Sequence, residues 1–91
     1  MASEKAISEE SIRQWLVEAV ARYVRVDVTR VRPTMAFEDI GLSSLAAVSL
    51  SAELSDAFGI DVDPLLTWEY PTIAEAARAI AQSGVCLRKP A

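Results

Sequence analysis

The sequence predicts a small all-α bundle with three main helices, one short helix and one long loop. Apolar residues make up 52% of the chain, and much of that share is alanine, which suits close-packed helices. The three glycines and four prolines stand near the ends of the periodic segments. Within those segments, apolar residues recur three and four positions apart, the spacing of one helix face. A chain of 91 residues has room for one hydrophobic core.

The first helix is expected to begin after Ser8 and to run to Val24. Ser8 can act as the N-cap, and Glu9 and Glu10 favour the positive end of the helix dipole. The residues expected on its core face are Ile12, Trp15, Leu16, Ala19, Val20, Tyr23 and Val24. This spacing favours Trp15 and Tyr23 as core residues over ligand-binding aromatics.

Periodicity stops between Val26 and Ser43, so the sequence predicts a long connection there. A connection of this length in a small domain is usually functional or held in place by its own side chains. Apolar residues that would hold it are Val28, Val31, Met35, Phe37 and Ile40. Arg32 precedes a proline and is therefore expected to be extended.

The second main helix is expected to begin at a pair of serines. Ser43 is predicted to be the N-cap, with its hydroxyl accepting a hydrogen bond from a backbone N–H near Ala46. Ser44 would then be the first helical residue, with a free side chain. Gly59 is expected to end the helix in a left-handed conformation.

Two apolar faces are expected on this helix. The core face comprises Ala47, Leu50, Leu54, Ala57 and Phe58. Leu45, Val48 and Ala52 lie on a different face. They either pack on another helix or form a small exposed patch beside Ser44.

Two further helices are predicted in the last third of the chain. Asp63-Pro64 can cap and open a short helix from Leu65 to about Glu69. Thr72 and Glu75 have the spacing of a capping box, which opens a last helix that ends near Gly84. Its core face would comprise Ile73, Ala76, Ala77 and Ile80. The domain is therefore expected to span 8–83, with a polar lead at 1–7 and a tail or linker at 84–91.

The composition argues against an independent enzyme. There is no histidine, and Cys86 is the one cysteine, so a Ser-His-Asp triad, an internal disulfide and most zinc sites are excluded. No pair of carboxylates stands in an apolar setting that would raise a pKa. No apolar run approaches the roughly 18 residues of a membrane helix. The polar start does not resemble a signal peptide, so a cytoplasmic protein without membrane contact is expected.

The net charge of −4 is unevenly distributed. Acidic residues without a basic one occupy the segment from Pro33 to Ala77: Glu38, Asp39, Glu53, Asp56, Asp61, Asp63, Glu69 and Glu75. A basic cluster precedes them: Arg22, Arg25, Arg30 and Arg32. We interpret the acidic segment as a face that attracts basic partners. The basic cluster is short and has no aromatic platform beyond Tyr23, which argues against nucleic acid as a partner.

Several short motifs in this order resemble the acyl carrier domains of polyketide synthases. They are Phe37-x-x-Ile-Gly-x-Ser-Ser-Leu45, Ala47-Val48-x-Leu50, Leu54, Phe58-Gly-Ile60 and Tyr70-Pro-Thr-Ile73. The resemblance runs from about Ile12 to Ile80. It implies a four-helix carrier domain with 4′-phosphopantetheine joined covalently to Ser44, beside Ser43 as the helix cap. The thiol of this arm would hold an acyl intermediate as a thioester, and partner enzymes would supply the catalysis.

The resemblance also implies the partners. They are a phosphopantetheinyl transferase, an acyl-loading enzyme (an acyl-adenylate ligase or an acyltransferase), and a ketosynthase or other synthase domains. The carrier would be a monomer. Its partner-binding residues are expected to be Leu45, Val48, Ala52 and Asp56.

The chain departs from the family pattern in two places. Ser43 stands where carrier domains usually have aspartate, which removes a negative charge that the transferase or its magnesium ion senses. The Gly-Leu-Ser-Ser form is similar to carriers charged by fatty acyl-adenylate ligases. Serines at 49, 51 and 55 occupy outward positions that are often acidic in fatty acid synthase carriers. Partner docking would then depend more on apolar contact and less on salt-sensitive attraction.

Two alternatives remain open from the sequence. A peptidyl or aryl carrier domain of a nonribosomal peptide synthetase would share the fold and the arm. A helical protein-interaction module would carry no arm and would be indifferent to replacement of Ser44.

Overall fold

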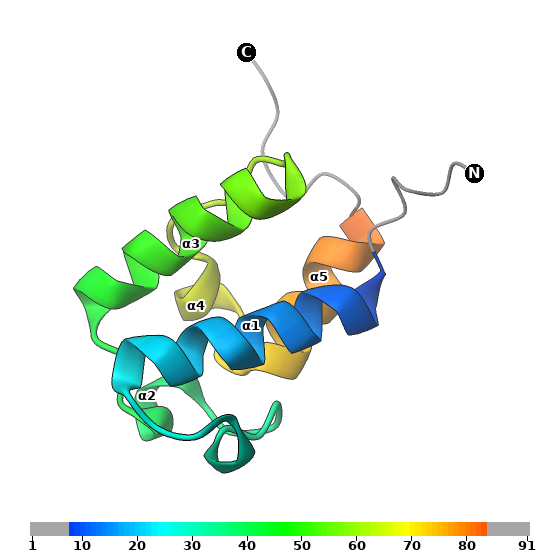
Figure 1. Ribbon diagram of the computed structural model, residues 1–91. Coiled ribbons are helices and arrows are strands. Elements are labelled where there is room, and N and C mark those ends of the chain that lie inside the picture. Colours follow the sequence, from blue (N-terminus) through cyan, green and yellow to red (C-terminus); the bar gives the residue numbers. More distant parts are fainter. Residues whose placement is uncertain (1–7, 84–91) are drawn as a thin grey trace.

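The computed structural model describes residues 8–83, which form an all-α domain (Figure 1). The helices are α1 (Glu9–Val24), a 3-10 helix (Val28–Arg30), α2 (Phe37–Ile40), α3 (Ser44–Phe58), α4 (Leu66–Glu69) and α5 (Ile73–Ser83). No β-strand is present in this part of the chain, apart from an isolated bridge between Ala36 and Thr72. The predicted fold class is therefore confirmed. The expected lead, the tail and Cys86 lie outside the described residues.

Helix α1 begins and packs as its sequence predicts. The Ser8 side chain accepts a hydrogen bond from the Ser11 backbone N–H at 3.1 Å, which satisfies one of the free donors of the first turn. The fully buried residues on its inner face include Ile12, Leu16, Ala19 and Val20. Trp15 packs edge-on against Phe58 of α3, with ring centroids 6.1 Å apart. Trp15 and Tyr23 are only partly buried, but both pack against the core.

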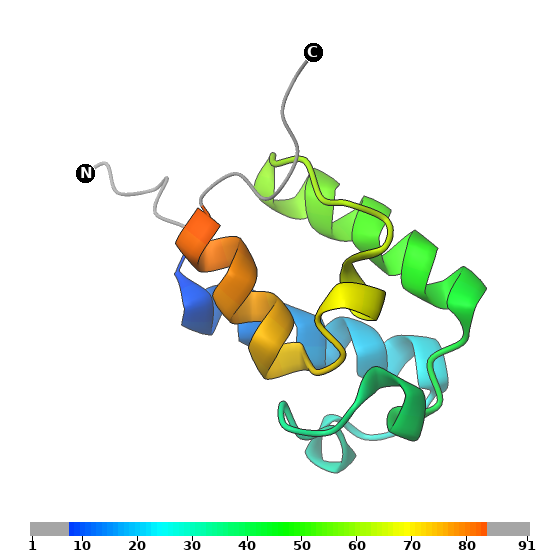
Figure 2. The ribbon, with the colours of Figure 1, turned by 180° about the vertical axis from the view of Figure 1, so that it is seen from behind.

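The core lies between α1, α3 and α5. In both ribbon views α5 lies beside α1, and α4 lies between α3 and α5 (Figures 1 and 2). The largest fully buried side chains are Ile12, Leu16, Val20, Leu50, Leu54, Leu66, Ile73 and Ile80. The end of α1, α2 and the start of α3 lie together at one end of the bundle (Figures 1 and 2).

The long connection after α1 contains two short helices that the sequence did not predict. A helix of three or four residues is too short to show the three- and four-residue periodicity from which helices are recognised. Backbone bonds fix its second part: Phe37 N–H donates to the Pro71 carbonyl at 2.8 Å, and Ala74 N–H donates to the Pro33 carbonyl at 2.9 Å. Val28 was expected to help hold the connection in place, but it is 43% exposed because it stands on the outer 3-10 turn.

Helix α3 has its predicted ends, but its inner face differs in two positions. Gly59 closes it with φ of 67°. Ala57, expected in the core, is exposed, and Ser51, expected to point outward, is 2% exposed. Ser51 can be buried because its hydroxyl donates to the Ala47 carbonyl one turn earlier, at 3.1 Å. Ser55, also expected outward, is half-buried and accepts a hydrogen bond from Val62 N–H.

The two last helices begin close to their predicted positions. Helix α4 starts at Leu66, one residue later than expected, because Asp63 forms a turn in which its side chain accepts from Leu65 N–H at 2.9 Å. At α5, the Thr72 hydroxyl accepts from Glu75 N–H at 3.1 Å, which is one of the two hydrogen bonds of a capping box.

Candidate functional site

The serine pair stands at the start of α3, where a backbone turn brings it to the surface. Gly41 ends α2 with φ of 103°, a left-handed conformation that favours glycine. Its N–H donates to the carbonyls of Phe37 and Glu38, both at 3.2 Å, and Leu42 N–H also donates to the Phe37 carbonyl. The chain therefore leaves α2 in a fixed direction and reaches Ser43 after a single residue.

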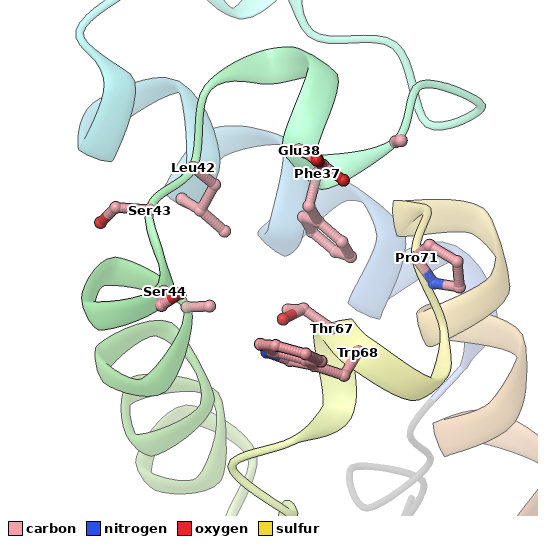
Figure 3. A pocket seen from close by; sticks show the side chains of 10 residues that line it. Phe37, Glu38, Leu42, Ser43, Ser44, Thr67, Trp68 and Pro71 are labelled. Carbon is pink, nitrogen blue, oxygen red and sulfur yellow. The ribbon is translucent and has the colours of Figure 1, made fainter.

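The two serine hydroxyls have different surroundings. The Ser43 side chain accepts from Ala46 N–H at 3.1 Å, so it is the predicted N-cap. Ser44 is the first residue of α3, and both serines are exposed. Figure 3 shows the Ser43 hydroxyl directed away from Trp68, whereas Ser44 lies across a cavity from that ring. Only one of the two hydroxyls is thus used to hold the helix end.

Ser44 borders an open cavity of about 580 Å³, which we call the serine cavity (Figure 3). Its lining comes from α2, from the start of α3 and from α4: Ala36, Phe37, Glu38, Leu42, Ser43, Ser44, Ala47, Thr67, Trp68 and Pro71. Phe37 and Ala47 are buried, while Trp68 is 71% exposed. The cavity therefore has an apolar base and a large aromatic side chain at its edge, with hydroxyl and carboxylate groups around it.

The remaining predicted site residues lie on the outer face of α3. Leu45 is 77% exposed and Val48 is 46% exposed, and Ala52 and Asp56 are exposed as well. Steps of three and four residues put all four on one helix face. The sequence left open whether Leu45, Val48 and Ala52 pack on another helix or form an exposed patch beside Ser44. The structure shows the exposed patch. None of the four lines the serine cavity.

The far wall of the serine cavity was not predicted from the sequence. Trp68 and Thr67 belong to α4, more than twenty residues after the serine pair, and nothing in the local pattern links them to it. One signal was available for Trp68. On a four-residue helix that buries Leu66, a side chain two positions away must point to the other side.

The electrostatic surroundings of the serines are simple. The first turn of α3 contains no acidic residue, so no carboxylate there opposes an anion at the helix start. Farther along α3, Glu53 accepts a hydrogen bond from the Tyr23 hydroxyl at 2.6 Å, and Arg22 lies 3.9 Å from its other oxygen. The hydrogen bond to Glu53, together with burial, raises the pKa of Tyr23.

Residues 8–83 contain neither a candidate metal centre nor a candidate membrane span. No three histidine, cysteine or acidic side chains of that segment lie close enough to share a metal ion. No helix in it is both long and apolar enough to cross a membrane.

This chain is similar to a family of phosphopantetheine attachment sites and to part of a polyketide synthase. A family model described as "Phosphopantetheine attachment site" matches residues 14–80. One chain of the phenolphthiocerol/phthiocerol polyketide synthase of Mycobacterium tuberculosis is 37% identical over 73 residues, which is 80% of this chain and 4% of that protein. The chain thus spans a small fraction of the length of the curated relatives it matches.

Two solved structures share the fold. A free-standing peptidyl carrier protein from an Acinetobacter baumannii secondary metabolic pathway superposes with a TM-score of 0.78 at 29% identity, covering 84% of this chain and 95% of the other. The HMG-ACPI domain of the CurA module from Lyngbya majuscula also gives 0.78, at 20% identity, covering 91% of this chain and 84% of the other.

Proposed function

Since this chain belongs to the phosphopantetheine attachment-site family and resembles the carrier domains of polyketide synthases, we propose that Ser44 is the residue that carries its arm. The cofactor of the family is covalently attached 4′-phosphopantetheine. When bound, this group supplies a terminal thiol that holds an acyl intermediate as a thioester. Domains of this family are generally non-catalytic, and we extend that to this chain.

We choose Ser44 over Ser43 because the two hydroxyls differ in their hydrogen bonding. The Ser43 hydroxyl is engaged at 3.1 Å as the acceptor that caps α3, whereas Ser44 is exposed, stands outside that hydrogen bond and borders the serine cavity. A phosphodiester at position 43 would disturb the cap, which is worth about 1 kcal/mol. At position 44 it leaves the cap intact.

The start of α3 fits a phosphate group. Ala46 N–H is used by the cap, and Ala47 N–H donates to the Ser43 carbonyl at 2.9 Å. The N–H groups of Ser44 and Leu45 precede the first intrahelical bond and so have no partner within the helix. They can donate to phosphate oxygens, and the positive end of the helix dipole favours the charge.

Ser43 in place of the family's usual aspartate affects recognition more than folding. The cap is formed equally by a serine hydroxyl. The missing carboxylate lowers the negative charge beside the attachment site, where a transferase would hold its magnesium ion. We infer slower loading by a transferase that uses that charge. Replacing Ser43 with Asp should therefore speed loading while leaving the cap in place.

The partners we propose dock on the outer face of α3. Leu45, Val48 and Ala52 present an apolar strip next to Ser44, and Asp56 continues it. The proposed partners are a phosphopantetheinyl transferase, an acyl-adenylate ligase or acyltransferase, and a ketosynthase or other synthase domain. We propose a cytoplasmic, monomeric carrier that binds neither nucleic acid nor membrane.

The acyl source we propose is a fatty acyl-adenylate ligase, on the Gly-Leu-Ser-Ser form of the site. The test is transfer from a fatty acyl-adenylate by such a ligase, followed by mass spectrometry. Transfer of malonyl or amino acid units alone would contradict this assignment.

A peptidyl carrier is the second candidate, and the Acinetobacter baumannii peptidyl carrier protein favours it at 29% identity. The polyketide type is preferred because the curated relative at 37% identity is a polyketide synthase. Loading by an amino acid adenylation domain, with no loading by acyl ligases or acyltransferases, would reverse this preference.

The attachment site is tested by intact-protein mass spectrometry after incubation with coenzyme A and a broad-specificity transferase. We expect one added phosphopantetheine in the wild type and in Ser43→Ala, and none in Ser44→Ala. Loss in Ser43→Ala alone would move the site. No addition to the folded wild type would favour a helical interaction module without an arm.

A further inference from the structure

Trp68 is exposed to an unusual degree for its size. Its side chain is 71% exposed on a four-residue helix whose Leu66 is buried at 2%. Tryptophan carries the largest apolar surface of any side chain, and it is commonly found where one part of that surface is later covered by a ligand or partner. The burial of Leu66 turns this ring outward, and Trp68 is not among the partly buried side chains that pack against the core.

The ring stands at the edge of the serine cavity, opposite the first residue of α3 (Figure 3). The buried Phe37 and the half-buried Leu42 also line the cavity, and Thr67 adds a hydroxyl next to Trp68. The volume of about 580 Å³ falls within the range of small-molecule sites. A group attached to Ser44 would thus begin at the rim of a site of suitable size.

We propose that the serine cavity receives the phosphopantetheine arm of this same chain, with the Trp68 indole packed against the pantetheine part. The arm then rests on its own domain between deliveries instead of extending into water. This inference rests on the proposed attachment at Ser44.

The chemistry of the pantetheine part matches the lining. It carries two methyl groups on one carbon and two flat amides. The methyl groups suit the apolar base and the indole face, and the amides suit stacking on an aromatic ring. Amides also need hydrogen-bond partners when they leave water, and the Thr67 hydroxyl points into the cavity on the side of Ser44 (Figure 3).

The same lining argues against the hydrocarbon end of an acyl chain as the occupant. The Glu38 carboxylate and the Thr67 hydroxyl border the cavity, and a hydrocarbon would strip water from them without replacing its hydrogen bonds. A second copy of the chain is also a poorer fit, because the arm already starts at the cavity rim.

The test uses the loaded chain and observes the arm directly. A transferase moves the phosphopantetheinyl group from coenzyme A, labelled with ¹³C in its two methyl groups, to the Ser44 oxygen and releases adenosine 3′,5′-bisphosphate; the added mass verifies loading. In the wild type the methyl proton signals should move upfield from those of free 4′-phosphopantetheine, because they lie over the indole ring. The upfield shift should vanish in Trp68→Ala. It should persist in Leu65→Ala, a matched control on the segment leading into α4 that is 54% exposed and outside the cavity lining.

A second measurement needs no change at Trp68. In a Trp15→Phe background, which keeps an aromatic ring against Phe58, Trp68 is the remaining tryptophan in the sequence. Acrylamide should quench its fluorescence about twofold less in the loaded chain than in the unloaded chain, because an occupied cavity covers the ring.

The outcomes separate the two proposals. If the chain takes up no phosphopantetheine, both the proposed function and this inference are wrong. If it is loaded but the methyl signals match those of the free arm, or quenching is the same before and after loading, only the resting position of the arm is wrong.

Discussion

At the scale of single residues, one left-handed position governs how the site is presented, and a second one ends α1. Gly41 has φ of 103° and Arg25, the residue after α1, has φ of 62°. The first is a glycine and carries little conformational cost, whereas the second is not. Gly41 sends the chain from α2 into Ser43, so its conformation matters directly for the start of α3.

We predict opposite effects on stability at these two positions. Gly41→Ala should lower the free energy of unfolding by about 1–2 kcal/mol through backbone strain alone. A Cβ at this position would meet nothing within 4 Å, so a steric clash adds no cost. Arg25→Gly should leave stability unchanged or raise it by up to about 1 kcal/mol. Urea unfolding measures both, and an equal loss in the two variants would contradict the strain argument.

At the scale of elements, the ends of helices were predictable because capping is local. The hydroxyl of Ser43, the left-handed Gly59 and the Thr72–Glu75 spacing act within three or four residues of where they stand. Burial on α3 was less predictable, since Ser51 is buried only because its hydroxyl can bond one turn back. A face assigned by polarity alone misses a polar side chain that satisfies itself.

The hydrogen bond that joins Tyr23 of α1 to Glu53 of α3 should affect how the free energy of unfolding depends on pH. The Tyr23 hydroxyl donates to Glu53 at 2.6 Å, and this bond raises the pKa of Tyr23 in the folded chain. The folded state then holds the phenol proton more tightly than the unfolded state. This contribution is complete below the unfolded pKa of about 10 and is lost as pH rises through the folded pKa.

We therefore expect Tyr23→Phe to lose about 0.5–1.5 kcal/mol at pH 7. Above pH of about 10 the difference between the wild type and the variant should shrink, because the wild type loses the bond as well. Denaturant unfolding across pH 7 to about 11 measures this. A constant difference would mean that Tyr23 acts only through packing.

A substitution on the outer face of α3 should affect partner docking and not the stability of the fold. Leu45→Glu should leave the free energy of unfolding within about 0.5 kcal/mol of the wild type, since the side chain is 77% exposed. Its loading rate with a transferase or acyl ligase should fall at least about tenfold, because a charge replaces an apolar contact. Leu65→Glu, at a position 54% exposed ahead of α4, is the matched control and should load normally. Unchanged loading kinetics in Leu45→Glu would remove α3 as the docking face.

At the scale of the whole molecule, the serine cavity is what the sequence could not supply. It joins residues near 36–47 to residues near 67–71, and such a pairing depends on the whole fold. The serine pair itself was identifiable from a short motif. The ring that faces it was not, because Trp68 is close to Ser44 only after α3 and α4 have packed (Figure 3).

The charge distribution gives a prediction for the whole molecule. The net charge is −4, yet the outer face of α3 is largely apolar, since Leu45, Val48 and Ala52 are apolar and Asp56 is its charged residue. The rates at which a transferase or an acyl ligase loads this chain should vary by less than about tenfold between low and high salt. Electrostatic attraction that guides association changes association rates by about 10- to 1000-fold. Rates measured from about 50 to 500 mM NaCl check this. A steeper fall would assign docking to the acidic residues.

The two backbone hydrogen bonds that join the long connection to Pro71 and to the first turn of α5 have a consequence for hydrogen exchange. Phe37 N–H and Ala74 N–H are each held by a carbonyl distant in sequence, at 2.8 and 2.9 Å. Separation of these two segments frees both amides at once and moves α2 away from Pro71, which opens the serine cavity on that side. The two amides should therefore exchange with deuterium at matched rates. Their common rate reports how often the cavity wall opens, and it can be measured without a ligand.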